Sequence, residues 1–301
     1  MSQLYTSQPT VNRLLTIFSS LFHSATRPTR HLLAWLLIAQ LALESASSVR
    51  CLFRQFLSKQ TDASLNSYYR ALGNGLVTDA SIRRALTLRA LAIVPQALRQ
   101  EPILLSVDDT TIAKWGNHFD GVGILYDHAK HDGKSYFNGH AFVTLSKSGS
   151  YRLFFSTIDP MALHMSIAWQ ENKGLRNTSS KHMAIYPLKL YKLRWGIETN
   201  YYEQKMFWEL GSYKVRTRTA IEHLLNLTNA GHALMKILPY EDERLSAYQD
   251  KSPQELWHAL SQQIHKEVFF ATLVSKAQSS INSSTFLKAL QALAWGDGQA
   301  A

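Results

Sequence analysis

Apolar side chains recur at intervals of three and four residues through most of the first hundred positions. This spacing places them on one face of a helix and predicts several short helices separated by polar breaks. Pro28 stands near the start of the first helix, and Asp62 or Ser64 could cap the helix that begins at Leu65. The predicted helices cover residues 29–47, 48–56, 65–72 and 79–95.

From residue 102 the pattern changes to short apolar runs, which predict strands. The runs cover residues 103–109, 139–145 and 151–158. The stretch between the first two, residues 116–135, is rich in Gly, His and Asp and is expected to be a polar loop. Helical spacing then resumes near Tyr186 and continues, with breaks, to the C-terminus.

This order of elements predicts an α/β core, of the α+β kind, between two helical regions. We expect a basic helical region over residues 1–100, the core over residues 101–235 and a C-terminal helical region over residues 236–301. The longest apolar run, residues 32–43, is shorter than the about 20 residues of a membrane-spanning helix. With no signal-peptide pattern and a single cysteine, Cys51, expected to be buried and reduced, we predict a cytoplasmic protein without a membrane partner.

The charge of the chain favours a polyanionic partner. Its net charge is +10 and its pI is about 9.6, and residues 1–100 hold eleven Lys or Arg against three Asp or Glu. Short basic helices with tight breaks are compatible with helix-turn-helix binding of double-stranded DNA. A helical bundle whose arginines only face water explains the same pattern.

One predicted helix carries four polar side chains on a single face. They fall within an arc of about 60°, because a helix turns about 100° per residue: Tyr191, Arg194, Glu198 and Lys205. The carboxylate could hold a divalent metal while the cations and the phenol bind phosphate oxygens. An ordinary amphipathic helix with a Glu–Arg pair and a solvated Lys has the same spacing. Glu203 lies about 140° around the helix from Glu198 and is expected to face elsewhere.

The spacing Tyr-x2-Arg-x3-Glu-x6-Lys resembles the signature of IS4-type DDE transposases, and we call the predicted helix the signature helix. A second similarity lies upstream, where residues 104–116, LLSVDDTTIAKWG, resemble the family's first catalytic strand and the acidic-Asp-Thr-Thr turn that ends it. The similarity covers residues 30–240. It implies a ribonuclease-H-like core, a helical region that grips the terminal inverted repeats of a transposon, and a homodimer on double-stranded DNA.

The resemblance also implies the residues of the site. Such enzymes hold divalent metals, Mg²⁺ or Mn²⁺, between three carboxylates for strand cleavage and transfer. Asp109 is implied as the first metal ligand and Glu198 as the last. Asp108 is the alternative to Asp109, since neighbouring side chains alternate between the faces of a strand, and a pair that caps a turn explains both residues without a metal. The groups implied to bind DNA phosphates are Tyr191, Arg194 and Lys205.

The family's middle aspartate has no clear counterpart. Only 88 residues lie between Asp109 and Glu198, fewer than in the family, so we expect an internal deletion near residues 146–150 and an incomplete core. Asp159, at the end of a predicted strand, is the candidate substitute. The other aspartates of this interval fall in the polar loop: Asp120, Asp127 and Asp132.

Four histidines lie around the same loop: His118, His128, His131 and His140. Zinc sites favour tight pairs of ligands with further Cys or His at set distances, and the only cysteine is distant, so a structural role fits these histidines better.

Two functions remain open. The chain is either an active IS4-type transposase or a catalytically dead, DNA-binding derivative or remnant that could inhibit transposition. Both would associate with the bacterial nucleoid when bound to DNA.

Overall fold

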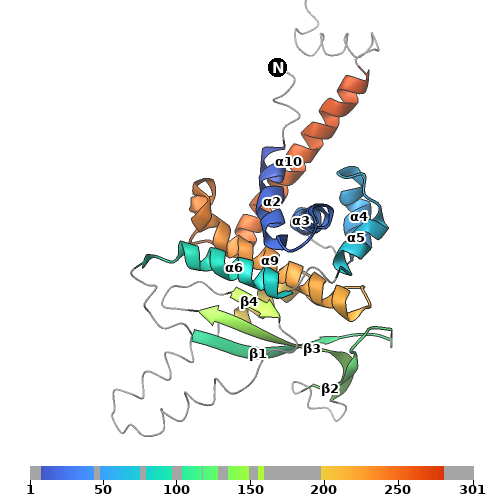
Figure 1. Ribbon diagram of the computed structural model, residues 1–301, viewed down its shortest axis with the longest axis vertical. Coiled ribbons are helices and arrows are strands. Elements are labelled where there is room, and N and C mark those ends of the chain that lie inside the picture. Colours follow the sequence, from blue (N-terminus) through green and yellow to red (C-terminus); the bar gives the residue numbers. More distant parts are fainter. Residues whose placement is uncertain are drawn as a thin grey trace, which may run out of the picture.

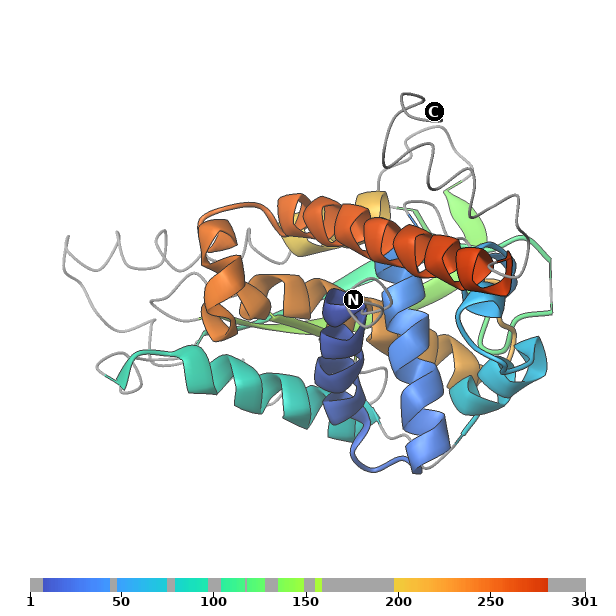
Figure 2. The same ribbon diagram turned by 90° about the horizontal axis from the view of Figure 1, so that it is seen from above.

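The computed structural model describes residues 8–43, 48–74, 79–96, 104–116, 118–127, 135–148, 155–158 and 198–280. In this part of the chain, helices cover one face of a four-stranded sheet (Figure 1). α6 (Asp79–Ile93) and α9 (Arg218–Glu241) form the layer next to the sheet. α2 (Pro9–Ser19), α3 (Arg27–Ala42) and α10 (Pro253–Ser280) lie beyond them (Figures 1 and 2). The described chain is therefore a helix-rich α+β structure.

The helices predicted for the N-terminal region are present. α3 holds Pro28 in its first turn. Ser48 caps α4 (Val49–Gln55) and Ser64 caps α5 (Leu65–Leu72) through side-chain oxygens that accept backbone N–H groups, so Ser64 rather than Asp62 is the cap. Cys51 is half-buried rather than buried, because Val49 and Leu52 take the core positions of α4. Short 3-10 turns, η1 (Ser20–Phe22) and η2 (Leu57–Lys59), complete this region.

The sheet is built around one long strand. β3 (Tyr136–Ser148) pairs antiparallel with β1 (Leu104–Ala113) along the whole length of β1. On its other edge β3 pairs with β2 (Gly123–Tyr126) near its start and with β4 (Phe155–Ile158) near its end. All described pairings are antiparallel, and three of these four strands were predicted.

Two predictions for the sheet are wrong. β1 does not end in a turn at Asp109 but continues to Ala113, because Thr110, Thr111 and Ile112 favour extended backbone and pair with β3. Because β1 continues past Asp108 and Asp109, these residues do not form the turn cap that was the alternative explanation. The expected polar loop contains β2, a short run whose residues are mostly exposed. Gly121, with φ +77°, turns the chain ahead of it.

The sheet and the outer helices both pack against α9. Its buried residues run from Ala220 to Pro239 on every side of the helix, and it contacts α3, α5, α6, α10 and β4. Apolar residues from the helices and from the sheet, such as Ile112 and Phe142, belong to one buried core. α9 passes without a break through residues 235 and 236, where the sequence suggested a domain boundary.

Side chains of α10 form hydrogen bonds with the C-terminal end of α3 and the N-terminal end of α2. Trp257 Nε1 donates to the carbonyl of Leu41 at 2.8 Å, and Ser261 and His265 contact the carbonyl of Ala42 at 3.2 and 2.6 Å. These carbonyls end α3 and have no partner within the helix. At the start of α2 the carboxylate of Glu267 accepts the N–H groups of Thr10 and Val11, where a negative charge complements the helix dipole. These hydrogen bonds therefore join the first and last described helices.

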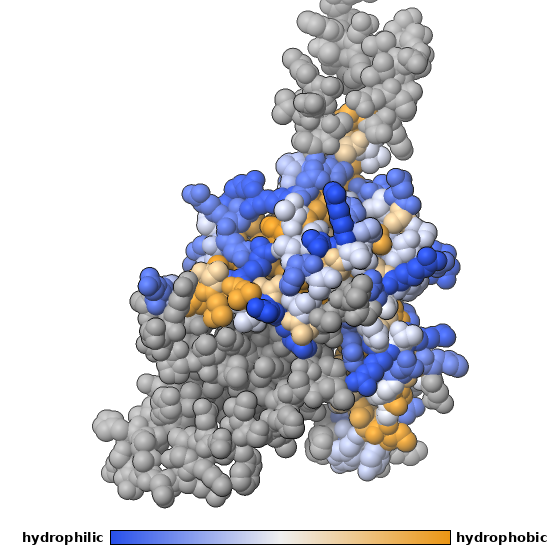
Figure 3. Space-filling model, viewed as in Figure 1, coloured by the Kyte–Doolittle hydropathy of each residue, from blue (hydrophilic) through white to orange (hydrophobic). Residues whose placement is uncertain are grey.

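The surface of the helical layer is mainly polar. Figure 3 shows hydrophilic side chains over much of its described part on the face in view. Among the described side chains of the sheet, Ile124 and Tyr126 of β2 and Tyr136 opposite them are exposed. Among the described helices, none is long and apolar enough to cross a membrane.

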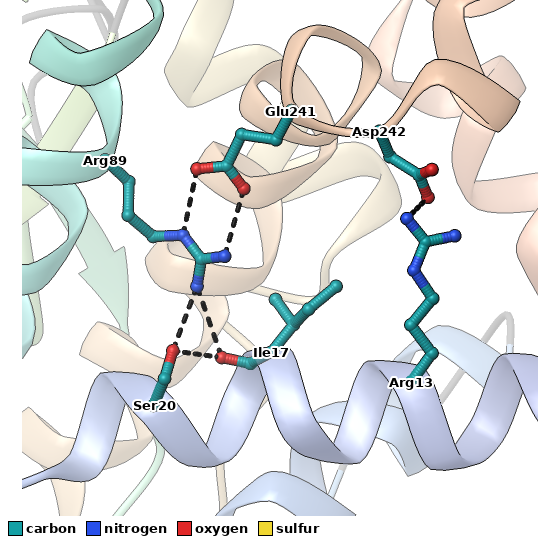
Figure 4. A network of polar contacts seen from close by, with 6 residues as sticks. All are labelled: Arg13, Ile17, Ser20, Arg89, Glu241 and Asp242. Atoms are coloured by element: carbon teal, nitrogen blue, oxygen red, sulfur yellow. Dashed lines mark hydrogen bonds and ion pairs between the residues drawn. The ribbon is translucent and has the colours of Figure 1, made fainter.

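An arginine joins α6 to the ends of α2 and α9 (Figure 4). Arg89 Nε and Nη2 donate to the two carboxylate oxygens of Glu241 at 3.0 Å each. Its Nη1 donates to the carbonyl of Ile17 at 3.3 Å and to Ser20 Oγ at 3.0 Å. The neighbouring acid, Asp242, forms an ion pair with Arg13 of α2. The planar guanidinium fixes the angle between these helices better than a point charge would.

The tight contact between Gly231 of α9 and the Trp208 ring gives a test of the packing around this helix. A Cβ added at Gly231 would lie 2.5 Å from Cζ3 of Trp208, closer than carbon atoms pack. We expect Gly231→Ala to lower the free energy of unfolding by about 1–3 kcal/mol, although alanine favours a helix more than glycine does. Urea denaturation would measure this. Adding Trp208→Phe, which removes the opposing ring atoms, should recover part of the loss. A Gly231→Ala variant as stable as the wild type would contradict the packing.

Candidate functional site

The described part of the signature helix, residues 198–207, is amphipathic. Asn200, Tyr201 and Gln204 are buried, whereas Glu198 is partly exposed and Lys205 is exposed. Positions seven apart on a helix differ by only about 20°. Glu198 and Lys205 therefore share the less buried face, as predicted.

Lys205 brings this helix to β1. Its ammonium donates to the carbonyl oxygen of Thr111 at 3.5 Å. Burial lowers the pKa of Lys205 below its ordinary value. Among the described strands β1 pairs only with β3, so its other edge is the one that this contact occupies. The two sequence motifs, far apart along the chain, thus meet at one edge of the sheet.

The two candidate aspartates lie in β1 close to that contact. Asp108 is opposite Thr144 and Asp109 is opposite Val143 on β3. Asp109 precedes Thr111 by two residues, or about 7 Å along a strand. Their side chains lie outside what the structure describes. So do the whole residues Asp159, Tyr191 and Arg194.

A second contact joins β1 to the segment that follows the signature helix. Lys114 Nζ donates to the carbonyls of Gly211 at 2.7 Å and Tyr213 at 3.1 Å, and lies 3.3 Å from the centre of the Tyr213 ring. Burial lowers the pKa of Lys114 to about 8. Carbonyl dipoles and the ring face stabilise the buried ammonium in place of a carboxylate. Lys114 carries no signal in the sequence, because its partners, two carbonyls and the Tyr213 ring, lie about a hundred residues away.

His140 has the structural role that the sequence favoured. Its Nε2 contacts the carbonyl of Asp120 at 2.8 Å, and its Nδ1 contacts the hydroxyl of Tyr213 at 2.5 Å. Burial raises the pKa of Tyr213, so the phenol stays a neutral donor and His140 Nδ1 accepts from it. The carboxylate of Asp120 accepts the N–H of Arg218 at 3.1 Å. Asp120 therefore caps the start of α9.

Glu203 faces α9; its position on the helix predicted only a direction different from that of Glu198. Its Oε2 lies 2.7 Å from His232 Nε2 and 3.2 Å from Lys236 Nζ. Burial lowers the pKa of His232 to about 4, against the opposing effect of Glu203. The imidazole is therefore neutral at pH 7, with Nε2 donating to Glu203 and Nδ1 accepting from Gln204 at 3.4 Å. Burial would raise the pKa of Glu203, but the hydrogen bond from His232 and the charge of Lys236 hold it below its ordinary value.

The described side chains alone do not form a metal centre. Among them, no group of three or more His, Cys, Asp or Glu could hold a metal ion. Asp109 and Asp159 are outside that set. What the structure does show is one carboxylate, Glu198, and one cation, Lys205, on a helix face that meets the strand of Asp109.

Comparison with known proteins adds one finding. The sequence model of the family described as "DDE superfamily endonuclease" matches residues 17–182, more than half of the chain. The match begins within α2, includes β1 with Asp108 and Asp109, and ends before the signature helix. No curated protein and no solved structure matches the chain.

The buried histidine predicts a specific dependence of stability on pH. Since the pKa of His232 is about 4 in the folded protein against an ordinary 6.5, the unfolded chain takes up a proton first as the pH falls. Its contribution to stability is complete above pH 6.5 and is lost progressively toward pH 4. We expect wild-type stability to fall over pH 6.5–4.5 by up to about 1.4 kcal/mol per pH unit more than that of His232→Gln. Urea unfolding at stepped pH measures both slopes, and equal slopes would contradict the assignment.

Proposed function

The chain belongs to the DDE superfamily endonucleases, and on that premise we propose that it is a DNA transposase of the IS4 type. It would bind the terminal inverted repeats of a transposon and cut and join DNA strands with Mg²⁺ or Mn²⁺. The observation that carries this proposal is the contact of Lys205 with the carbonyl of Thr111. It joins the last residue of the signature to the strand of the first catalytic motif, as a shared active site requires.

We propose Asp109 and Glu198 as metal ligands. Both are carboxylates, the ligand type that Mg²⁺ and Mn²⁺ prefer, so the donor set fits a hard cation. When bound, such metals activate the attacking oxygen and stabilise the leaving oxygen of an in-line displacement. The chain's own contribution is to bring the strand and the helix together.

The burial pattern of β1 favours Asp109 over Asp108. Thr111 is exposed, whereas Thr110 and Ile112 are buried. Positions 109 and 111 share one face of a strand, and positions 108, 110 and 112 share the other. The position of Asp109 therefore shares the face of the exposed Thr111, and this alternation supports Asp109 as the proposed ligand.

Asp159 remains the proposed third carboxylate. It directly follows β4, whose last residue, Ile158, pairs with Thr144 on one edge of β3. On the other edge of β3, Thr144 pairs with Asp108. Two strand spacings, about 10 Å, therefore separate the backbone at Ile158 from that at Asp108. This level in the sheet supports Asp159 as the substitute for the missing aspartate in a shortened ribonuclease-H-like core.

DNA binding is proposed for two surfaces. On the signature helix, Lys205 binds a phosphate together with Arg194 and Tyr191. The helical region of residues 1–100, with its excess of eight positive charges, grips the flanking duplex by neutralising further phosphates. The transposase would act as a homodimer on paired ends.

The alternative is a catalytically dead DNA-binding derivative, able to inhibit transposition by occupying the ends. The specific observation in its favour is that hydrogen bonds from α10 and α9 hold the N-terminal helices in place. These bonds do not involve the proposed third carboxylate. The cleavage assay below separates the two functions, because the derivative binds DNA without cutting it.

Cleavage should depend on the two ligands. In Mg²⁺ or Mn²⁺, with DNA that carries the ends flanking the gene, we expect Asp109→Asn and Glu198→Gln each to lower strand nicking on the order of 100-fold or more. DNA affinity should change little. Asp108→Asn is the matched control and should retain most activity, and Asp159→Asn tests the third position. Nicking by Asp109→Asn at the wild-type rate would refute the site.

Binding should depend steeply on salt. The logarithm of the affinity should fall linearly with the logarithm of the salt concentration, and Lys205→Met should make the slope shallower by about 1. Lys251→Met is the control, because Lys251 is exposed, lies just before α10 and pairs with Glu255 of that helix. Fluorescence anisotropy with labelled DNA measures all three proteins. An unchanged slope for Lys205→Met would remove Lys205 from the DNA interface.

A further inference from the structure

A cluster of buried polar side chains joins the signature helix to α9. We call this cluster the helix lock. Glu203 accepts hydrogen bonds from His232 and Lys236. Lys236 also donates to Asn200 Oδ1 at 2.6 Å, and Gln204 contacts His232 at 3.4 Å. Asn200, Gln204 and His232 are at most 2 % exposed.

The helix lock joins two turns of each helix. Asn200 lies one turn before Gln204 on the signature helix, and His232 lies one turn before Lys236 on α9. Lys236 reaches the earlier turn of the signature helix and His232 the later one, while Glu203 contacts both α9 residues. The crossed pattern holds the helix at two points along its axis, which a single ion pair cannot do.

Buried polar partners match at only one offset of the two helices. Apolar side chains can exchange neighbours at small cost, so a purely apolar seam tolerates sliding. Moving the signature helix by one turn, about 5.4 Å, would leave the Glu203 carboxylate or the Lys236 ammonium buried without its partner. An unpaired buried charge is strongly disfavoured, so the helix lock specifies one axial position and one rotation.

We infer that the helix lock sets the position at which Glu198 and Lys205 face β1, and that Glu203 is a positioning residue of the proposed active site. This rests on the proposed function, since Glu198 and Lys205 matter only if the site binds metal and DNA. A helix is stiff over ten residues, so its rotation at Glu203 determines the directions of Glu198 and Lys205. Glu203 Oε2 already accepts from two donors and is turned toward α9, away from the proposed metal.

Kinetics separate positioning from binding. Glu203→Gln keeps the shape of the side chain and removes the charge that compensates Lys236. We expect its cleavage rate at saturating DNA to fall about 10–100-fold, with the DNA dissociation constant within about twofold of the wild type. Glu222→Gln is the matched control, because it breaks another Glu–cation pair of α9, that with Arg218 at 2.8 Å, outside the helix lock. It should cleave at the wild-type rate. A weaker DNA affinity with an unchanged cleavage rate would overturn the inference.

A cross-link measures the geometry without any activity. The chain has a single cysteine, so Cys51→Ser gives a background in which Thr111→Cys and Lys205→Cys form one reactive pair across the observed contact. A short bismaleimide should join them, and adding Glu203→Gln should slow the cross-link about 10-fold or more. Adding Glu222→Gln should leave it unchanged. An equal rate with Glu203→Gln would overturn the inference.

The two readouts keep the inference distinct from the proposed function. If the wild type does not cleave DNA, the proposed function fails and the cross-link rate alone decides on the helix lock. If Glu203→Gln does not fold by circular dichroism, His232→Leu replaces it, because this variant removes one donor and retains the Glu203–Lys236 pair. It should slow the cross-link in the same direction, and an unchanged rate in that variant would equally contradict the inference.

Discussion

The burial of α9 on all sides is the constraint on which the rest of the structure depends. From Ala220 to Pro239 the helix is enclosed by the outer helices, by α6 and by the sheet. A helix in this position must satisfy its polar side chains within the protein. Two of them, His232 and Lys236, do so through the signature helix. The same burial that forms the core therefore places the candidate active-site helix.

Two further contacts complete the site around this helix. Lys205 binds the edge of β1, and Lys114, at the end of β1, binds the segment that follows the signature helix. The strand of Asp109 is thereby held at two places to the chain around residues 205–213. The proposed metal-dependent cleavage needs carboxylates from separate parts of the sequence, and these contacts bring the strand of Asp109 and the helix of Glu198 to one edge of the sheet.

Local patterns predicted much of the fold because local forces determine it. Pro28 and Ser64 marked helix starts, and apolar runs marked β1, β3 and β4. β2 was missed because its four residues pair with β3 while remaining largely exposed, so no apolar run marks them. The full extent of β1 was missed because the family resemblance suggested a turn at Thr110 and Thr111. In the structure both residues belong to the strand and pair with β3.

The site could be predicted only as far as it depends on helix geometry. The shared face of Glu198 and Lys205 and the different direction of Glu203 both follow from 100° per residue. The partners of Glu203 could not be identified this way, because helix geometry does not say which residues about thirty positions away lie opposite a given side chain. The polar residues Asn229, His232 and Lys236, spaced three and four apart in an otherwise apolar helix, were the available sign of a buried polar face.

The proposed active site requires that β1 and the signature helix together hold a divalent metal. The most direct measurement replaces Mg²⁺ by Fe²⁺ with ascorbate and peroxide, so that hydroxyl radicals cut the backbone beside the bound metal, and maps the cuts by mass spectrometry. If Asp109 and Glu198 hold one metal, cuts should occur near both residues and excess Mg²⁺ should suppress them. Cuts at neither position, or at only one of them, would contradict it.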